Sequence, residues 1–518
     1  MTRRSCPIIC GNGVFLLIMK RFFLFFVSLF FLLSAYSAER VKLSYVVTPD
    51  TLGHYLNVKL TCENVTEPLR LKMPVWAPGY YVIVDFPKYL TDFKAQDADG
   101  SLLSWNKEGK NTWIIQPKDG KAMVSYRIFA NERSVAECRV ENQMAFVAPN
   151  GVFMYVDGQK DSPITVNYEL PLNWKNISTG LKRINDSTFE ASDADVLYDS
   201  PVLLGNHYVK KFNYEGHDYE FALETPDGVE QTHFEEDFKK MVSATTRLMG
   251  HVPYDNYCLI HLGKGQGGLE HHNSQACYTD GSFRFKDDAA YKNYMGFTTH
   301  EYFHLYNVKS IRPIELGPFD YDREVFTPLL WVSEGFTVYY ETRLMLSAGI
   351  IDSDYLLNDL SSYIKTIEGN EGHRHMSLRQ SSYDIWLNFF NRAANGKDVR
   401  ISYYDKGPIL GLLFDIEIRR MTQGKKSLDD LMRLLYNRYY IELKRGFTEQ
   451  EFWASSQEVA GQELTLLRKY VDTTAEIDYD GILNQAGLYL DRSTWQLKRL
   501  EHPKKAQLKL CREMGLCK

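Results

Sequence analysis

The residues with the clearest chemical signature lie in the segment HEYFH at positions 300–304. Side chains four apart in a helix lie on one face, about one turn from each other, so His300 and His304 can present imidazole nitrogens to one metal ion. Glu301 projects in a different direction, toward the water on the open position of that ion, where a carboxylate acts as general base. The motif therefore predicts a helix that carries two ligands and the base of a zinc-dependent hydrolase.

A catalytic zinc site requires a third protein ligand, and Glu334 is the candidate. It lies in WVSEG (331–335), within an apolar run whose continuation favours a helix. Glu324 is the rival, because other metallopeptidases with a glutamate ligand place it about twenty residues past the second histidine. Prolines and glycines surround Glu324, and such punctuation predicts a loop between two helices. We therefore expect Glu334, and not Glu324, to complete the site with His300 and His304.

Two further segments carry residues suited to binding a substrate. In GGLEH (267–271), paired glycines let the backbone approach a ligand closely, and the carboxylate of Glu270 follows directly. Downstream, YDKG (404–407) places a tyrosine at the entrance to a helix that Pro408 can start.

These segments, in this order along the chain, resemble the glycyl aminopeptidase family of zinc metallopeptidases. The resemblance covers about residues 40–490. It rests on HEYFHLYNVKSIRP (300–313), LLWVSEGFTVYYE (329–341), GGLEH (267–271), the Tyr-x-Lys-Gly segment and PVWAPGYYVIVDF (74–86). The motifs are also similar, more distantly, to the large zinc aminopeptidase family.

The resemblance implies one zinc ion bound by His300, His304 and Glu334, with Glu301 activating water. The family shows the same long spacing between the second histidine and the glutamate. Glu341, further along the expected helix, either orients a ligand histidine or is a surface glutamate.

The resemblance also implies the residues that hold the substrate. Glu270 occupies the position of a glutamate that binds the free α-ammonium of a peptide, with Gly267 and Gly268 beside it; a buried ammonium needs such a charged partner. The other interpretation of Glu270 is a carboxylate in a solvated loop. Tyr404 matches a tyrosine that donates a hydrogen bond to the oxyanion of the tetrahedral intermediate, and Tyr403 is its rival.

Other polar residues near the motifs have no role that the sequence assigns. Asn307, Lys309 and Arg312 match the family's Asn-Val-Lys-x-Ile-Arg-Pro segment, and they either line the cleft or close the helix. Three nearby histidines lack ligand spacing and are expected to be structural or solvated: His261, His271 and His272.

The composition is that of a soluble enzyme. The chain has 518 residues, 44% of them hydrophobic and 24% charged, with a formal net charge of −6. These values allow a substantial core and two or three domains, and they indicate no basic surface for nucleic acid. Of the cysteines, Cys511 and Cys517 are the pair closest in sequence after the leader, although pairing cannot be read from sequence.

The N-terminus carries a targeting signal. KR at 20–21 precedes the apolar run FFLFFVSLFFLL (22–33), and small residues at 35–38 suit a cleavage site. This predicts a signal peptide over 1–38, export to the periplasm or the medium, and no stable membrane embedding after cleavage. An uncleaved anchor is the alternative, and Met19 is an alternative start.

The predicted fold class is α+β. Period-two alternation predicts a β-sandwich-like N-terminal domain. A helix over about 230–249 and a strand at 257–261 then lead into a thermolysin-like catalytic domain. The expected divisions are 39–207 for the β domain, 208–350 for the catalytic domain, 351–490 for a helical C-terminal part, and 491–518 for a tail too short to hold the PDZ domain of longer family members.

We therefore expect an exported zinc aminopeptidase that acts on peptides with a free N-terminus. The family name implies a preference for N-terminal Gly or Ala. The alternatives are a zinc endopeptidase on the same scaffold and a non-catalytic peptide-binding relative. The sequence indicates no oligomeric state.

Overall fold

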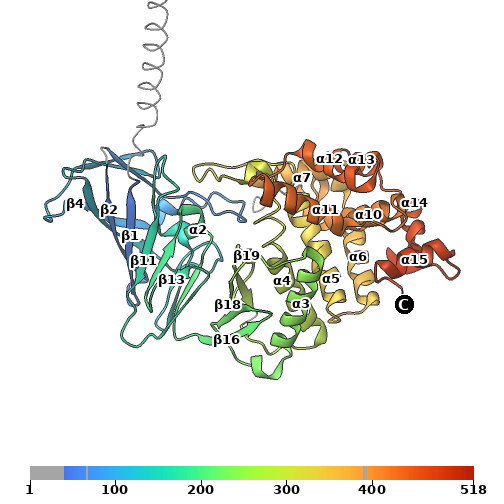
Figure 1. Cartoon of the computed structure of the whole chain (residues 1–518), viewed down its shortest axis with the longest axis horizontal. Helices are drawn as coiled ribbons and strands as arrows, with labels where there is room; N and C mark the ends of the chain where they lie inside the picture. Colours follow the sequence, from blue (N-terminus) through green and yellow to red (C-terminus); the bar gives the residue numbers. More distant parts are fainter. Residues whose placement is uncertain (1–39, 66–67, 280, 389–393, 518) are drawn as a thin grey trace, which may run out of the picture.

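The computed structural model describes residues 40–65, 68–279, 281–388 and 394–517. The predicted leader, residues 1–38, lies outside these ranges. Figure 1 shows a β domain at one end of the molecule and a helical part at the other, with a second sheet and the HEYFH helix between them. No helix within the described ranges is long and apolar enough to cross a membrane.

The β domain is built on a seven-stranded sheet with the strand order β13-β14-β11-β1-β2-β7-β4. Strands β1 (Lys42–Asp50) and β2 (Tyr55–Glu63) pair antiparallel along their full length, and buried side chains alternate with more exposed ones in both. The period-two pattern of the sequence thus places one face of the sheet on the core. The other strands are β4 (Leu90–Gln96), β7 (Lys121–Phe129), β11 (Ile164–Tyr168), β13 (Lys182–Arg183) and β14 (Thr188–Ala191).

Two four-stranded sheets, of order β10-β3-β6-β5 and β12-β15-β9-β8, pack with the first sheet. Their strands are β3 (Leu69–Lys72), β5 (Trp105–Glu108), β6 (Thr112–Ile115), β8 (Arg139–Val140), β9 (Met144–Val147), β10 (Tyr155–Val156), β12 (Asn176–Thr179) and β15 (Val202–Gly205). A short helix, α2 (Ala194–Tyr198), lies between β14 and β15 in the chain and is capped by the side chain of Asp193. The predicted N-terminal β domain is confirmed.

A five-stranded mixed sheet, of order β16-β17-β18-β20-β19, begins the catalytic part. The three inner strands run parallel, and the two outer strands pair antiparallel to their neighbours. The GGLEH motif contains strand β19 at the edge, and among the described residues no strand pairs with the outer side of its backbone. The strands are β16 (Tyr208–Tyr214), β17 (His217–Leu223), β18 (Asn256–Lys264), β19 (Gly268–Glu270) and β20 (Ser274–Thr279).

Helices α3 (Phe234–Met249) and α4 (Asp288–Phe303) pack beside this sheet, and α5 (Phe336–Ser347) packs against both of these helices. Helix α3 begins four residues later than the expected helix over 230–249, because a separate 3₁₀ turn occupies Val229–Gln231. Helix α4 carries the HEYFH motif at its C-terminal end.

The helical part beyond α5 packs against the catalytic helices through one long helix, α10 (Tyr403–Met421). Capping boxes form at the starts of two of its helices, at Ser427 and at Thr448. The other helices are α6 (Ser353–Glu368), α7 (Leu378–Tyr383), α8 (Ile385–Asn388), α9 (Gly396–Val399), α11 (Leu428–Leu435), α12 (Glu449–Ala460), α13 (Thr465–Asp472) and α14 (Tyr479–Leu483). The predicted α+β class is thus confirmed.

The expectation that Pro408 starts the helix after the tyrosine motif is wrong. Helix α10 begins at Tyr403, because the Ser402 side chain accepts a hydrogen bond from the Tyr404 N–H at 3.1 Å and caps it. Pro408 lies inside the helix, where it has no N–H to donate to the Tyr404 carbonyl. Tyr404, the candidate hydrogen-bond donor to the oxyanion, therefore lies in the first turn of α10.

A pair of glycines brings α10 against the segment that carries Glu334. A Cβ atom added at Gly335 would lie 2.5 Å from the Cα of Gly407. The two backbones therefore touch without intervening side chains, a distance that only glycine at both positions permits. This contact sets how closely the Tyr404 end of α10 approaches the metal-binding candidates.

Within residues 491–518, which were predicted as a tail, the described part 491–517 is folded onto the helical part. Its boundary falls inside a hairpin in which β21 (Leu488–Asp491) pairs with β22 (Gln496–Arg499). Helix α15 (Lys505–Glu513) follows, and a disulfide joins Cys511 and Cys517, with Cα atoms 5.3 Å apart. Buried apolar side chains in this segment explain its attachment to the core.

Replacing Gly407 with alanine tests the glycine contact. The added methyl group has no space against Gly335, so we expect the variant to lose about 1–3 kcal/mol of unfolding free energy. Urea denaturation measures this loss. Gly396→Ala is the matched control, because its Cβ would meet no atom of the described residues within 4 Å. Equal denaturation midpoints for Gly407→Ala and the natural protein would contradict the predicted crowding.

Candidate active site

The two motif histidines and Glu334 converge on one point. The Nε2 atoms of His300 and His304 lie 3.0 Å apart. Oε2 of Glu334 lies 3.6 Å from the first and 3.2 Å from the second. These three groups meet the spacing of a metal site, as predicted.

The outer ring nitrogens show that this donor set fits a metal. Nδ1 of His300 lies 3.0 Å from Oε2 of Glu341, and Nδ1 of His304 lies 2.7 Å from the carbonyl oxygen of Asn307. Both partners accept hydrogen bonds, so each Nδ1 carries the proton and each Nε2 keeps its lone pair. Two imidazole lone pairs and a carboxylate then face one another, an arrangement that a divalent cation stabilises. Of the two roles open to Glu341, the structure thus favours orienting a ligand histidine.

The electrostatics of the pocket also favour positive charge. Burial lowers the pKa of His300, but hydrogen bonds with Glu334 and Glu341 outweigh burial and raise this pKa well above its usual range. A proton on Nε2 of His300 therefore supplies positive charge at this point until a metal cation takes its place and binds the lone pair. Burial raises the pKa of Glu334, but the two histidines reverse that effect and lower it to about 2. The carboxylate is therefore ionised at neutral pH and available as a ligand.

Glu334 is held in place by a short π-helix, Trp331–Gly335, at the start of α5. The amide of Asn307 donates to the carbonyl oxygens of Val332 and Ser333, at 2.8 and 3.0 Å. Asn307 thus fastens the Glu334 segment to the end of the HEYFH helix, a role that the sequence did not assign. The rival Glu324 lies exposed in a loop, because its Pro- and Gly-rich surroundings form no helix.

Glu301 is buried beside the metal-binding candidates. Burial raises the pKa of its carboxyl to about 7, against the opposing effect of the two histidines. A Cβ atom at Gly268 would overlap this carboxylate, so the glycine permits the edge strand β19 to run directly past the expected base. Gly267 has a different requirement: its φ of +93° is one that other residues rarely adopt.

Glu270 lies at the end of β19 and is only 5% exposed, which rules out the solvated-loop interpretation. Its carboxylate and donor atoms of Glu301 and His304 all lie within 4.8 Å of one another. Gly79 of the β domain covers it: a Cβ atom there would lie 2.7 Å from Oε1 of Glu270. The β domain therefore closes this end of the site.

Tyr404, the candidate donor of a hydrogen bond to the oxyanion, lies beside the metal-binding candidates. Its ring centroid lies 6.4 Å from that of His300, and the ring of Tyr403 packs against it at 4.7 Å. Burial raises the pKa of Tyr404 well above its usual range, and the negative charge of Glu334 raises it further. The phenol therefore remains protonated and able to donate a hydrogen bond.

Two residues of the β domain belong to the site although sequence analysis missed them. Gly79 lies within the segment 74–86, which contributed to the family resemblance but was assigned no function from the sequence. No sequence pattern indicates that Asp199 belongs to the site, because this residue lies far from every motif and matches none. In the structure its carboxylate contacts Lys309 and His271.

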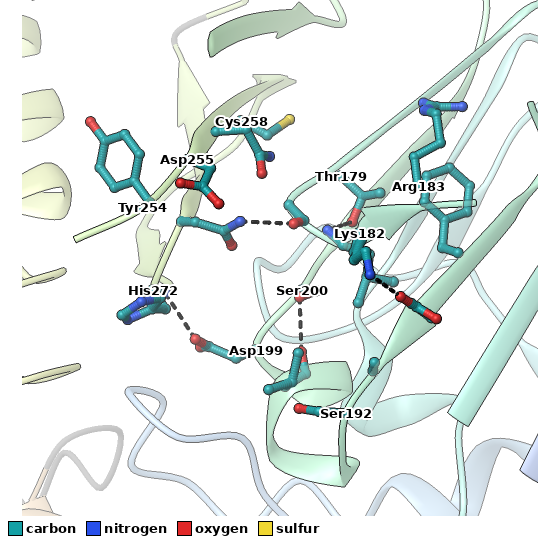
Figure 2. Close-up of a pocket in the computed structure, with 18 of the residues that line it drawn as sticks. Thr179, Lys182, Arg183, Ser192, Asp199, Ser200, Tyr254, Asp255, Cys258 and His272 are labelled. Carbon is teal, nitrogen blue, oxygen red and sulfur yellow. Dashed lines mark hydrogen bonds and ion pairs between the residues drawn. The ribbon is translucent and has the colours of Figure 1, made fainter. Parts of the chain in front are cut away.

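The three histidines without ligand spacing stay outside the metal group, as expected. His261 is buried and contacts the hydroxyl of Tyr294. His271 is buried, and His272 is half-buried on the wall of a cavity of about 1360 Å³ between the β domain and the catalytic sheet. Figure 2 shows this cavity, in which His272 lies near Asp199 on one side and Lys182 and Arg183 lie on the other.

Comparison with known proteins follows the same division of the chain. Residues 44–206 match the Peptidase M61 N-terminal domain, and residues 293–410 match the M61 glycyl aminopeptidase domain. Together the two matches cover more than half of the sequence. The chain belongs to the M61 glycyl aminopeptidase family. Membership makes the protein a metallopeptidase, a peptide-bond hydrolase, and confirms the resemblance seen in its motifs.

Solved structures show the same fold. An aminopeptidase N family protein from Idiomarina loihiensis superposes with a TM-score of 0.81 and 26% identity, over 86% of this chain and 78% of that one. An M1 zinc metallopeptidase from Deinococcus radiodurans gives a TM-score of 0.51 at 14% identity, over 85% and 95% of the two chains, which is a likeness of fold alone. Among curated proteins no sequence matches the chain.

Removal of the Glu341 carboxylate tests its contact with His300. We expect Glu341→Ala to lower the affinity for Zn²⁺ about 10- to 100-fold, because the ring of His300 loses the partner that orients it. Competition with a chelator of known affinity measures the change. Glu324→Ala is the matched control and should bind Zn²⁺ as the natural protein does. Equal affinities for both variants would show that Glu341 has no part in the site.

Proposed function

We propose that this protein is a zinc-dependent aminopeptidase that removes the N-terminal residue of peptides. The position of Glu270 is the observation that carries the proposal. Its carboxylate lies within 4.8 Å of donor atoms of Glu301 and His304. The α-nitrogen and the carbonyl carbon of one residue are only about 2.5 Å apart. An ammonium bound to Glu270 therefore leaves room for a single residue before the bond that is cut.

The donor set His300, His304 and Glu334 fits zinc, which when bound supplies a Lewis acid for the carbonyl and for water. The chain's own residues perform the remaining tasks. Glu270 binds the α-ammonium, and the open edge of β19 pairs with the peptide backbone.

Glu301 takes a proton from the attacking water and passes it to the leaving amine. Its place beside His300 and His304, and a pKa near neutrality, support both transfers. Tyr404 donates a hydrogen bond to the oxyanion of the tetrahedral intermediate. Its protonated phenol and its place in the first turn of α10 support this role.

The space beside Glu270 supports a small N-terminal residue. The cavity there has a volume of about 10 Å³, and Trp76, Gly79 and Tyr81 of the β domain are among the residues that line it. A volume of this size holds about one water molecule. We therefore propose that Gly and Ala are removed faster than Leu or Phe.

Blocking the substrate amine tests the exopeptidase assignment. We expect Gly- and Ala-fluorophore substrates to be cleaved and their N-acetylated forms to be resistant, because acetylation removes the charge that Glu270 binds. Rates are measured by fluorescence, with Glu301→Ala as the inactive control. In Glu270→Gln the KM for the free substrates should rise. Equal turnover of free and acetylated substrates would instead indicate an endopeptidase, and inactive zinc-loaded protein a non-catalytic relative.

Single substitutions distinguish the role of Tyr404 from that of Tyr403. We expect Tyr404→Phe to lower kcat about 10²- to 10³-fold with little change in KM, because the hydrogen bond forms only as the oxyanion develops. Tyr403→Phe is the matched control and should retain most of the activity. Steady-state kinetics on an alanyl substrate distinguish the two, and the reverse pattern would assign the oxyanion contact to Tyr403.

A further inference from the structure

The carboxylate of Asp199, in the β domain, contacts two segments that lie beside Glu270: residues 271–272 and the segment that carries Lys309. Asp199 lies directly after α2, and its oxygens accept hydrogen bonds from three groups. They are Lys309 Nζ at 2.7 Å, His271 Nδ1 at 3.1 Å and the His272 backbone N–H at 2.8 Å. Figure 2 shows the contact between Asp199 and His272 at the edge of the interdomain cavity.

Lys309 also lies beside Glu270. Its Nζ is 3.9 Å from Oε1 of Glu270, compared with 2.7 Å from Asp199. The Lys309 and Glu270 side chains are 10% and 6% exposed, so little water screens the charges. Lys309 is thus a cation placed where it competes with a substrate ammonium for the same carboxylate.

The charges of these three residues do not balance. Burial raises the pKa of Asp199, but Lys309 and His271 outweigh it and hold the pKa well below its usual range. Burial lowers the pKa of Lys309, but Asp199 and Glu270 reverse this and raise it. These three residues, two carboxylates and one ammonium, carry a net charge of −1 among themselves. The guanidinium of Arg312, which also acts on Lys309, is the same in every variant below.

We propose that Asp199 is a positioning residue that engages Lys309 and thereby leaves the charge of Glu270 for the α-ammonium of the substrate. The proposal rests on the proposed binding of that ammonium by Glu270. Substrate binding then brings Asp199, Lys309, Glu270 and the bound ammonium together to a net charge of zero. Without the Asp199 charge, Lys309 neutralises Glu270, and binding an ammonium leaves an uncompensated buried positive charge.

The decisive test is a charge-rescue cycle in the full-length, zinc-loaded enzyme. We expect Asp199→Asn to raise the KM for an alanyl-fluorophore substrate about tenfold or more, with a smaller change in kcat. Removing both charges in Asp199→Asn/Lys309→Met restores the net −1. The KM should then return to within about threefold of the natural enzyme. Lys309→Met alone should not raise KM.

Asp195→Asn is the matched control. Asp195 lies on α2, one turn before Asp199, and its carboxylate accepts a hydrogen bond from the Tyr321 hydroxyl at 2.6 Å instead of from Lys309. We expect its KM to match that of the natural enzyme. Zinc content and thermal unfolding of every variant show whether a change in KM accompanies loss of metal or of fold.

The outcomes distinguish a failure of the proposal for Asp199 from a failure of the proposed ammonium binding by Glu270. A purely structural role for Asp199 predicts that the double variant is as impaired as Asp199→Asn or more so, and this result would overturn the proposal. An unchanged KM in Asp199→Asn, in an enzyme whose Glu270→Gln variant shows a raised KM, overturns it equally. An unchanged KM in Glu270→Gln instead contradicts ammonium binding by Glu270, which is the proposed function itself.

Discussion

The convergence of His300, His304 and Glu334 is the interaction on which the rest of the structure depends. Two imidazole lone pairs and an ionised carboxylate within 3.6 Å of one another repel unless a proton or a metal cation lies between them. The surrounding fold must therefore hold these groups in place. Glu341 and the Asn307 carbonyl fix the two rings, and the Asn307 amide fixes the segment that carries Glu334. One residue, Asn307, thus orders ligands from two separate helices.

Close backbone contacts set the dimensions of the site. Gly335 and Gly407 let α10 approach the Glu334 segment, which brings Tyr404 within reach of the histidines. Gly268 likewise lets the edge strand pass directly beside Glu301. A side chain at any of these positions would separate elements that must act on one scissile bond.

The β domain is a structural part of the site as well as a neighbour of it. Gly79 covers the Glu270 carboxylate, and Asp199 reaches the lysine beside that carboxylate. Both contacts join segments far apart in the chain at the closed end of the cleft. Glu270, to which we assign the substrate terminus, is therefore supplied by the catalytic sheet, while its surroundings are supplied in part by the other domain.

The sequence by itself determined the chemistry and the fold class. Local periodicity established the β domain, and the four-residue spacing of His300 and His304 follows from helix geometry alone, so these predictions needed no tertiary information. The choice of Glu334 over Glu324 also rested on local helix and loop signals. Only the tertiary structure decided the roles of Asn307, Lys309 and Asp199, the depth of Glu270, and the attachment of residues 491–517. Each depends on contacts between distant segments, and burial and charge pairing across such contacts leave no pattern in the chain.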